Sequence, residues 1–194
     1  MDQNTIIIRR ATEDDAARMC DIYSYYVLQT VITCEYTVPS VEEFAGRIRQ
    51  TLQVYPFLVL EDGGTILGYA YASPFKGRAA YFRSCELSIY IDRTCHKRGY
   101  GRLLYEALEI ELKNAGLLNL YACITSPIVE DEYLTHNSEE FHIHMGFETV
   151  GEFHRCIYKF GRWYNMIWME KIIGEHEEQT AKVRSFSEIE GDKI

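Results

Sequence analysis

The order in which strand and helix patterns follow one another limits the fold more than any other feature of the chain. Three strand patterns succeed one another between residues 57 and 91, whereas the later helical patterns stand singly between strands. A doubly wound parallel sheet needs a helical crossover between successive strands. We therefore expect an α/β (α+β) fold, a single domain with one mixed, mostly antiparallel central sheet and flanking helices.

The predicted elements follow from apolar periodicity and from cap and turn residues. Strands are predicted at 5–9, 57–60, 65–73, 84–91, 118–124, 147–158 and 164–171. Helices are predicted from Thr12, from Ser40, over 101–114 and from Asn137, and each of the three named residues has an acidic partner three positions later for a capping pair. Gly116 and Gly146 are expected to end the last two helices.

The composition is that of an ordinary globular protein. The chain has 194 residues, 47% of them hydrophobic, and no run approaches the ~18 apolar residues of a membrane-spanning helix. The first residues lack a signal-peptide pattern, and the six cysteines are scattered without a C-x-x-C pair, which favours reduced thiols in a cytoplasmic protein. Residues 1–173 would form the domain, and the charged residues 174–194 a flexible tail.

One basic segment stands out in a chain whose formal charge is −9, a balance that argues against a nucleic-acid partner. It lies between a predicted strand and a predicted helix and reads His96-Lys97-Arg98-Gly99-Tyr100-Gly101-Arg102. Glycines let the backbone approach a ligand, and the amides of a helix start attract anions. We interpret it as an anion-binding bend; the alternative is a solvated turn with capping glycines. It lacks the third glycine of a dinucleotide fingerprint and the G-K-[ST] of a P-loop.

A strand, then [Q/R]-x-x-G-x-[G/A], then an apolar helix, resembles the acetyl-CoA signature of the GNAT superfamily of N-acetyltransferases. The resemblance extends to its phosphinothricin acetyltransferase-like branch and covers roughly residues 5–172. The supporting segments are residues 8–15, residues 86–91, His142 ahead of Met145-Gly146-Phe147, and Tyr158-Lys159-Phe160-Gly161-Arg162-Trp163. His96 stands where the family has Gln or Arg, and Thr135 where many relatives have Asn.

The resemblance implies a GNAT fold in which two middle strands, near 87–91 and 120–124, splay apart to receive the pantetheine arm of acetyl-CoA. The diphosphate of this co-substrate would bind to the segment 96–102. A backbone N–H near Ile89 or Ile91 would polarise the thioester carbonyl. Members of this branch are typically homodimers, so a homodimer is also expected.

Glu86 is an acid in the middle of a predicted strand, where carboxylates are disfavoured unless they are paired or functional. Strand alternation places Cys85, Leu87, Ile89 and Ile91 on one face, and Glu86, Ser88 and Tyr90 on the other. The resemblance assigns Glu86 the role of general base, for which partial burial would raise its pKa. The alternative is a structural glutamate paired with Arg78 or Arg83.

His142 matches the position where the family carries a Tyr, and this branch a His, near the thiol sulfur. There it could protonate the departing thiolate; the alternative is a histidine packed in the core beside Phe141 and Met145. His142 and His144 lie two residues apart on a helix and point to different sides, so we expect no metal.

The loop 74–81 resembles the acceptor-binding loop of the branch. Lys76 and Arg78 would suit an acceptor carboxylate, or they are solvated surface charges. Tyr36 would wall the acceptor pocket or is an ordinary loop aromatic, and Trp163 and Trp168 are expected in the core or at a subunit contact.

The leading hypothesis is an N-acetyltransferase acting on the amine of a small amino-acid analogue such as phosphinothricin or methionine sulfoximine. A second hypothesis keeps the chemistry but changes the acceptor to a polyamine, an aminoglycoside or a protein amine. A third is a non-catalytic acyl-CoA-binding module. Neither nucleic acid nor membrane is expected as a partner.

Overall fold

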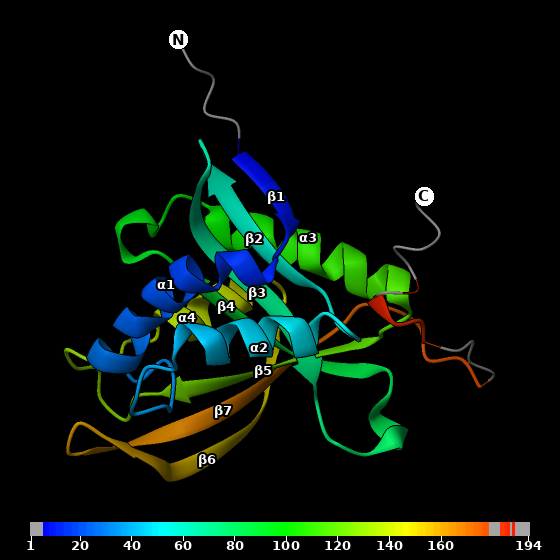
Figure 1. The fold of residues 1–194 in the computed structure, drawn as a ribbon. Coiled ribbons are helices and arrows are strands. Elements are labelled where there is room, and N and C mark those ends of the chain that lie inside the picture. The colour runs from blue at the N-terminus through cyan, green and yellow to red at the C-terminus, as the bar shows by residue number, and fades with distance from the viewer. Residues whose placement is uncertain (1–5, 179–182, 187, 189–194) are drawn as a thin grey trace.

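The strands form one open sheet in the computed structural model, which describes residues 6–178, 183–186 and 188. Within these residues the sheet has seven strands in the order β1-β2-β3-β4-β5-β7-β6, and only β4 and β5 run parallel (Figure 1). The strands are β1 (Ile6–Arg10), β2 (Phe57–Asp62), β3 (Thr65–Pro74), β4 (Ser84–Ile91), β5 (Asn119–Ser126), β6 (Glu148–Lys159) and β7 (Arg162–Ile172). The mixed, mostly antiparallel sheet is confirmed.

Four α-helices flank this sheet in the described part of the chain: α1 (Ala16–Gln29), α2 (Val41–Thr51), α3 (Tyr100–Ala115) and α4 (Asn137–His144). Helices α1 and α2 cover one face and α3 the other (Figure 1). Leu104, Leu108 and Leu112 of α3 are fully buried against the sheet, which is the apolar stripe that the sequence predicted. None of the described helices is long and apolar enough to cross a membrane.

Each face of the sheet has its own hydrophobic core, and the side chains of strand β4 alternate between the two. Cys85 and Leu87 are buried in the core under α3, whereas Tyr90 packs against the core under α1 and α2. The predicted alternation is therefore correct, and it places Glu86 on the face of α1 and α2.

Strands β4 and β5 pair over only three positions, Ser84 with Asn119, Cys85 with Leu120, and Glu86 with Tyr121. Beyond that point neither strand has the other as a ladder partner, although both continue for several residues. The splayed middle strands that the family resemblance implied are confirmed, and Glu86 lies on the last rung before they separate.

Two of the predicted capping pairs are confirmed and one is wrong. The Ser40 hydroxyl accepts a hydrogen bond from the Glu43 amide at 3.1 Å, and Thr12 forms a capping box with Asp15. At α4 the cap position belongs to His136, and Asn137 is already helical. The Glu130 carboxylate, which accepts from the His136 amide at 2.8 Å, supports this end from outside the local sequence.

Part of the predicted flexible tail packs on the domain. The Phe186 side chain is only 4% exposed, and its amide donates to the Val54 carbonyl at 3.0 Å. The Arg184 amide donates to Ala115, and the Arg10 guanidinium lies 5.1 Å from the Phe186 ring centre. A single buried aromatic residue produces no periodic pattern, so this docking could not be predicted from the sequence. Residues 179–182, 187 and 189–194 of the predicted tail lie outside the described residues.

Candidate active site

The segment between β4 and α3 forms the bend that the sequence predicted. A short turn, Arg93–Cys95, precedes it, and α3 begins directly after Gly99. Lys97 and Gly99 both have positive φ, at 61° and 80°. Gly99 occupies the N-cap position without a side-chain cap, so the first amides of α3 stay open toward an anion.

The two glycines of this bend have different roles. A Cβ on Gly99 would meet no atom within 4 Å, so the space outside it is open to a ligand. A Cβ on Gly101 would instead lie 3.2 Å from the Phe141 ring and 3.5 Å from Ile89. Binding of the diphosphate at both glycines stays a prediction, and the absent side chain of Gly101 also lets α3 pack closely on α4 and β4.

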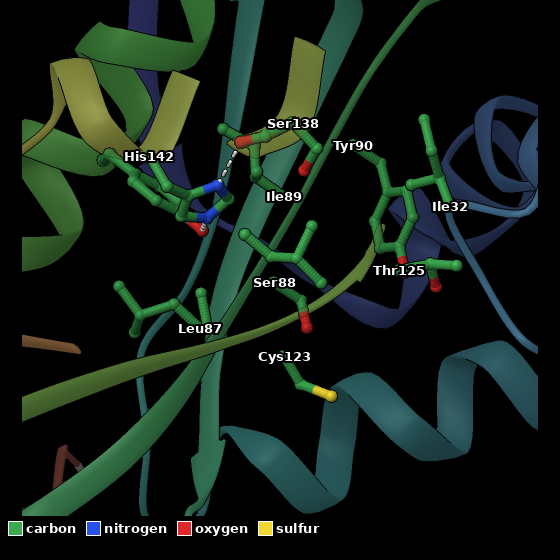
Figure 2. A pocket seen from close by; sticks show the side chains of 12 residues that line it. Ile32, Leu87, Ser88, Ile89, Tyr90, Cys123, Thr125, Ser138 and His142 are labelled. Atoms are coloured by element: carbon green, nitrogen blue, oxygen red, sulfur yellow. Dashed lines mark hydrogen bonds between the residues drawn. The ribbon is translucent and has the colours of Figure 1, made fainter. Parts of the chain in front are cut away.

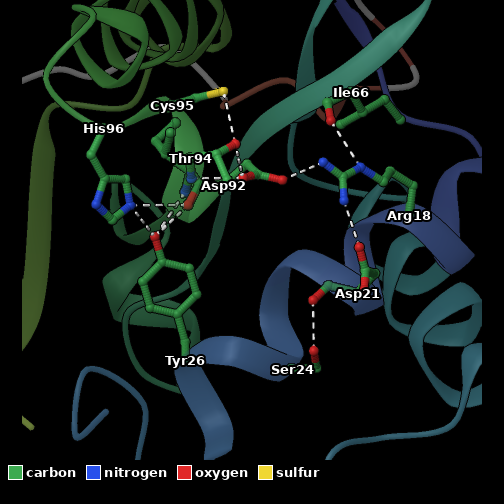
Figure 3. Close-up of polar contacts among 10 residues, drawn as sticks. Arg18, Asp21, Ser24, Tyr26, Ile66, Asp92, Thr94, Cys95 and His96 are labelled. Atoms are coloured by element: carbon green, nitrogen blue, oxygen red, sulfur yellow. Dashed lines mark hydrogen bonds and ion pairs between the residues drawn. The ribbon is translucent and has the colours of Figure 1, made fainter. Parts of the chain in front are cut away.

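His96 turns inward at the start of the bend. Its Nε2 lies 3.0 Å from the Tyr26 hydroxyl and 3.2 Å from the Ile91 carbonyl oxygen (Figure 3). The Ile91 amide in turn donates to the Tyr26 hydroxyl at 3.3 Å. This network ties the bend to α1 and to the end of β4. Tyr26 was missed by the sequence analysis, since a tyrosine on an apolar helix face carries no local sign of such a role.

The remaining basic side chains of the bend point outward. Lys97 and Arg98 are exposed, and the Arg102 guanidinium donates to the Glu106 carboxylate at 2.6 Å. Tyr100 is buried in the core under α3. Lys97 and Arg98 have no ion-pair partner within the described part of the chain, so the positive potential of the segment comes from these two side chains and from the open amides of the helix start.

A small cavity of about 60 Å³ lies where β4 and β5 separate (Figure 2). We call it the wedge cavity. Its walls come from β4, β5, α3 and α4 and include Ser88, Ile89, Tyr105, Cys123 and His142. The Ile91 amide points away from β3, toward Tyr26, and antiparallel alternation turns the Ile89 amide to the same side. The backbone of β4 thus offers a free donor at the wedge cavity.

Glu86 is half-buried at the closed end of the splay. Burial raises the pKa of its carboxyl above the ordinary value, while the Lys76 ammonium partly opposes this shift. Across the described residues Glu86 forms no hydrogen bond or ion pair, and the Arg83 guanidinium donates to the Gly116 carbonyl instead. In the described part of the chain, Glu86 is therefore not a structural glutamate paired with Arg78 or Arg83.

Lys76 is held close to Glu86 by aromatic rings. Its ammonium lies 4.7 Å from the ring centre of Phe75 and 4.8 Å from that of Trp168, at distances typical of cation–π contacts. Trp168 is half-buried and contacts this loop through Lys76, whereas Trp163 is 54% exposed. Neither tryptophan occupies the core position that was one of the two expected for them. Arg78 is exposed and is not among the charges that act on Glu86.

His142 is 4% exposed and hydrogen-bonded at both ring nitrogens (Figure 2). The Ser138 carbonyl, 2.7 Å from Nδ1, can only accept, so Nδ1 carries the proton. Nε2 then accepts from the Tyr105 hydroxyl at 3.0 Å. Burial lowers the pKa of His142 to about 4, and the neutral ring therefore has no second proton to give at neutral pH. Tyr105, which the sequence analysis missed, lines the wedge cavity beside this ring.

Tyr36 lies apart from the wedge cavity. Its ring is 66% exposed, and its hydroxyl donates to the Tyr158 carbonyl on β6. His144 is also exposed, with Nδ1 hydrogen-bonded to the Glu140 carbonyl. No group of three or more metal-ligating side chains occurs in the described ranges.

Comparison with known proteins supplies the family. A family model described as the acetyltransferase (GNAT) domain matches residues 8–168. The chain belongs to the GNAT acetyltransferases. It is an acyltransferase of the N-acetyltransferase type, as its curated relatives are.

Two curated relatives and one solved structure illustrate the similarity. The GNAT chain is 30% identical over 168 residues to a phosphinothricin N-acetyltransferase of Streptomyces coelicolor, covering 84% of this chain and 94% of the relative. It is 29% identical over 170 residues to an L-methionine sulfoximine/L-methionine sulfone acetyltransferase of Salmonella typhimurium, covering 87% and 95%. A phosphinothricin acetyltransferase of Sinorhizobium meliloti, solved in complex with AcCoA, superposes with a TM-score of 0.83 at 30% identity, covering 95% and 97%.

Proposed function

We propose that this enzyme transfers the acetyl group of acetyl-CoA to the α-amine of a small amino-acid-like acceptor of the phosphinothricin or methionine sulfoximine type. The names of the curated relatives support the acceptor class, and the solved relative in complex with AcCoA supports the donor. The observation that carries the proposal is Glu86, a half-buried carboxylate without a hydrogen-bond or ion-pair partner in the described chain, on the last rung of the β4–β5 ladder.

The donor would occupy the open side of the fold. The diphosphate fits the uncapped amides at Gly99 to Arg102 and the free space outside Gly99. The pantetheine arm fits between the splayed strands, and the thioester would reach the wedge cavity with its carbonyl oxygen near the Ile89 amide.

Glu86 would act as the base of a direct transfer. An ammonium cannot attack, so its proton passes to the Glu86 carboxylate, directly or through water. The free amine then forms the new C–N bond with the thioester carbonyl carbon while the C–S bond breaks. The nitrogen gives up one further proton and the thiolate takes one up, so that amine and acetyl-CoA yield amide and free thiol.

His142 would serve the leaving group through Tyr105. The only proton of the neutral His142 ring is on Nδ1, which donates it to the Ser138 carbonyl. The neutral ring therefore cannot itself protonate a thiolate. We propose that it orients the Tyr105 hydroxyl at the wedge cavity, and that this hydroxyl would turn its single proton from Nε2 toward the departing sulfur.

Lys76 would bind the acceptor carboxylate. Its ammonium lies near enough to Glu86 to affect the pKa of that carboxyl, so it could hold the acceptor with the amine at the base. Arg78 and Tyr36, also proposed for acceptor binding, lie farther out, and a bound acceptor or a partner subunit would have to bring them in.

Substitution of Glu86 by Gln tests the assignment. The neutral amide keeps the shape of the side chain but cannot accept the proton, so kcat/KM should fall on the order of a hundredfold or more. Acetyl-CoA affinity, measured by calorimetry, should stay unchanged. Full turnover in a thiol-release assay would remove Glu86 from the mechanism.

A second candidate acceptor is a polyamine, an aminoglycoside or a protein amine, which the net charge of −9 would attract. Lys76 beside Glu86 favours an acceptor with an anionic group instead. A thiol-release assay across amino acids, their analogues, polyamines and aminoglycosides separates these classes. Absence of thiol release with every acceptor would favour the non-catalytic acyl-CoA-binding module.

We also propose a homodimer that uses the β6–β7 hairpin. Strand β6 is the outer strand of the sheet and is almost wholly exposed. Phe153, Tyr158 and Trp163 on this hairpin are 54%, 49% and 54% exposed. An exposed group of large apolar rings of this kind is typical of a protein interface.

A further inference from the structure

A second cavity lies beneath α2, on the face of the sheet that carries Glu86. It measures about 260 Å³ and is enclosed by α1, α2 and strands β2 to β4. Six aromatic rings form most of its wall: Tyr23, Phe44, Phe57, Tyr69, Tyr71 and Tyr90. We call it the aromatic pocket. A cavity of ~150 Å³ with apolar walls already admits benzene, so this pocket has room for a substituted ring.

One wall of the pocket carries an unsatisfied polar group. Tyr69 is fully buried, with 0% exposure, and its hydroxyl has no hydrogen-bond partner in the described chain. Buried hydroxyls are normally paired, because a lone one loses its hydrogen bonds to water without replacement. An unpaired hydroxyl at the wall of a cavity indicates a partner that enters from outside the protein.

The pocket adjoins the proposed base. In the β3–β4 ladder Ser73 lies opposite Glu86, Tyr71 opposite Ser88, and Tyr69 opposite Tyr90. Cross-strand neighbours lie ~5 Å apart, so the pocket begins one side chain away from the carboxylate. Tyr90 lines both the aromatic pocket and the wedge cavity, so the two spaces share this side chain as a wall.

Among the described residues that line the pocket, Arg47 is the one cationic side chain, and it is already paired. The Arg47 guanidinium donates to Glu35 at 2.8 Å and to Glu43 at 2.6 Å, so this trio carries a net charge of −1 (one cation and two carboxylates). An anionic side chain would be repelled there, whereas an aromatic ring would gain edge and face contacts with the wall.

We infer that the aromatic pocket binds the side chain of the acceptor and that this enzyme prefers amino acids with a ring-bearing side chain, tyrosine above all. The inference rests on the proposed function for the position of the amine at Glu86. The phenol of such an acceptor would supply the partner that the Tyr69 hydroxyl lacks.

The first experiment compares kcat/KM for L-tyrosine, L-phenylalanine, L-alanine, phosphinothricin and methionine sulfoximine in the thiol-release assay. Tyrosine should exceed alanine by at least about tenfold, the factor that ~1.4 kcal/mol of differential binding gives. Equal values for tyrosine and alanine would overturn the inference and leave the proposed function intact.

Two variants locate the preference. Thr51→Phe places a ring in the pocket and should lower the tyrosine-to-alanine ratio at least tenfold, whereas Glu42→Phe, on the exposed side of the same helix, should retain it. Tyr69→Phe removes only the unpaired hydroxyl and should reduce the preference for tyrosine over phenylalanine. An unchanged ratio in Thr51→Phe would contradict the placement.

Calorimetry with L-tyrosine separates the inference from the proposed function. If no acceptor is acetylated, the proposed function fails, and binding of tyrosine that Thr51→Phe abolishes would still support the pocket. Absence of tyrosine binding in wild type and Glu42→Phe would refute it.

Discussion

Burial moves the pKa of Glu86 upward and the pKa of His142 downward, because in both residues it disfavours the charged form. The consequences for function differ. The raised pKa makes the Glu86 carboxylate a better proton acceptor, while the Lys76 ammonium partly opposes this shift. His142 becomes permanently neutral at physiological pH, which fits it to accept the Tyr105 hydrogen bond.

The influence of Lys76 on Glu86 predicts a shift in the pH profile. Lys76→Met removes the cation that stabilises the carboxylate, so the pKa of Glu86 should rise further. The base works only when deprotonated, and the acid limb of kcat/KM should therefore move to higher pH. Arg78→Met, which removes a charge without influence on Glu86, should leave that limb in place. An acid limb unmoved by Lys76→Met would show that Glu86 does not limit the rate there.

His142 predicts a loss of stability in mild acid. Its pKa falls from 6.5 in the unfolded chain to about 4 in the folded protein, so the unfolded state binds the extra proton. The contribution of neutral His142 to the free energy of unfolding is fully present above pH 6.5. It is lost as pH falls toward 4, at up to ~1.4 kcal/mol per pH unit. Denaturant unfolding between pH 7 and pH 5 should show a smaller loss in His142→Gln than in wild type. His144→Gln, which alters an exposed histidine, should retain the wild-type slope.

At the scale of elements, the junction of β4 with α3 performs two tasks with two glycines. Gly99 has a φ of 80°, which only glycine adopts readily, and it faces open space. Gly101 is an ordinary helical residue that allows close contact with Phe141. The same G-x-G spacing therefore combines an open backbone position, where we propose that the diphosphate binds, with a packing contact.

These two tasks can be separated by substitution. Gly99→Val should raise the Kd for acetyl-CoA at least tenfold, through strain at positive φ and a side chain in the diphosphate space. Gly101→Val should mainly lower the melting temperature, because overpacking costs about 1–3 kcal/mol. Calorimetry and thermal unfolding of both variants provide the measurements. A Gly99→Val protein that binds acetyl-CoA normally would place the diphosphate elsewhere.

At the scale of the whole molecule, the proposed function places donor and acceptor binding on different faces of the sheet. The proposed donor site lies with α3 and the splay, and the proposed acceptor pocket lies under α1 and α2. The stretch of β4 from Glu86 to Tyr90 lies between the two, and beyond Glu86 it has no ladder contact with β5 in the described chain. The exposed rings of the β6–β7 hairpin stand at the far edge of the sheet.

The exposed hairpin predicts a dimer in solution. Light scattering should give twice the mass of one chain, and Trp163→Arg should reduce it by placing a charge in the interface. Ile110→Arg, which replaces a 61% exposed residue on α3, should leave the dimer intact. A monomeric wild-type protein would refute the proposal.

The sequence by itself determined the elements, their order and the bend, because periodicity, capping pairs and glycine act over a few residues. It also singled out Glu86, since a carboxylate in an apolar strand is conspicuous. Only the tertiary structure decided what surrounds these residues. Tyr26 reaches His96, Tyr105 reaches His142 and Trp168 reaches Lys76 across 70, 37 and 92 positions of the chain. Contacts of that span depend on how whole elements pack, and no local pattern encodes them.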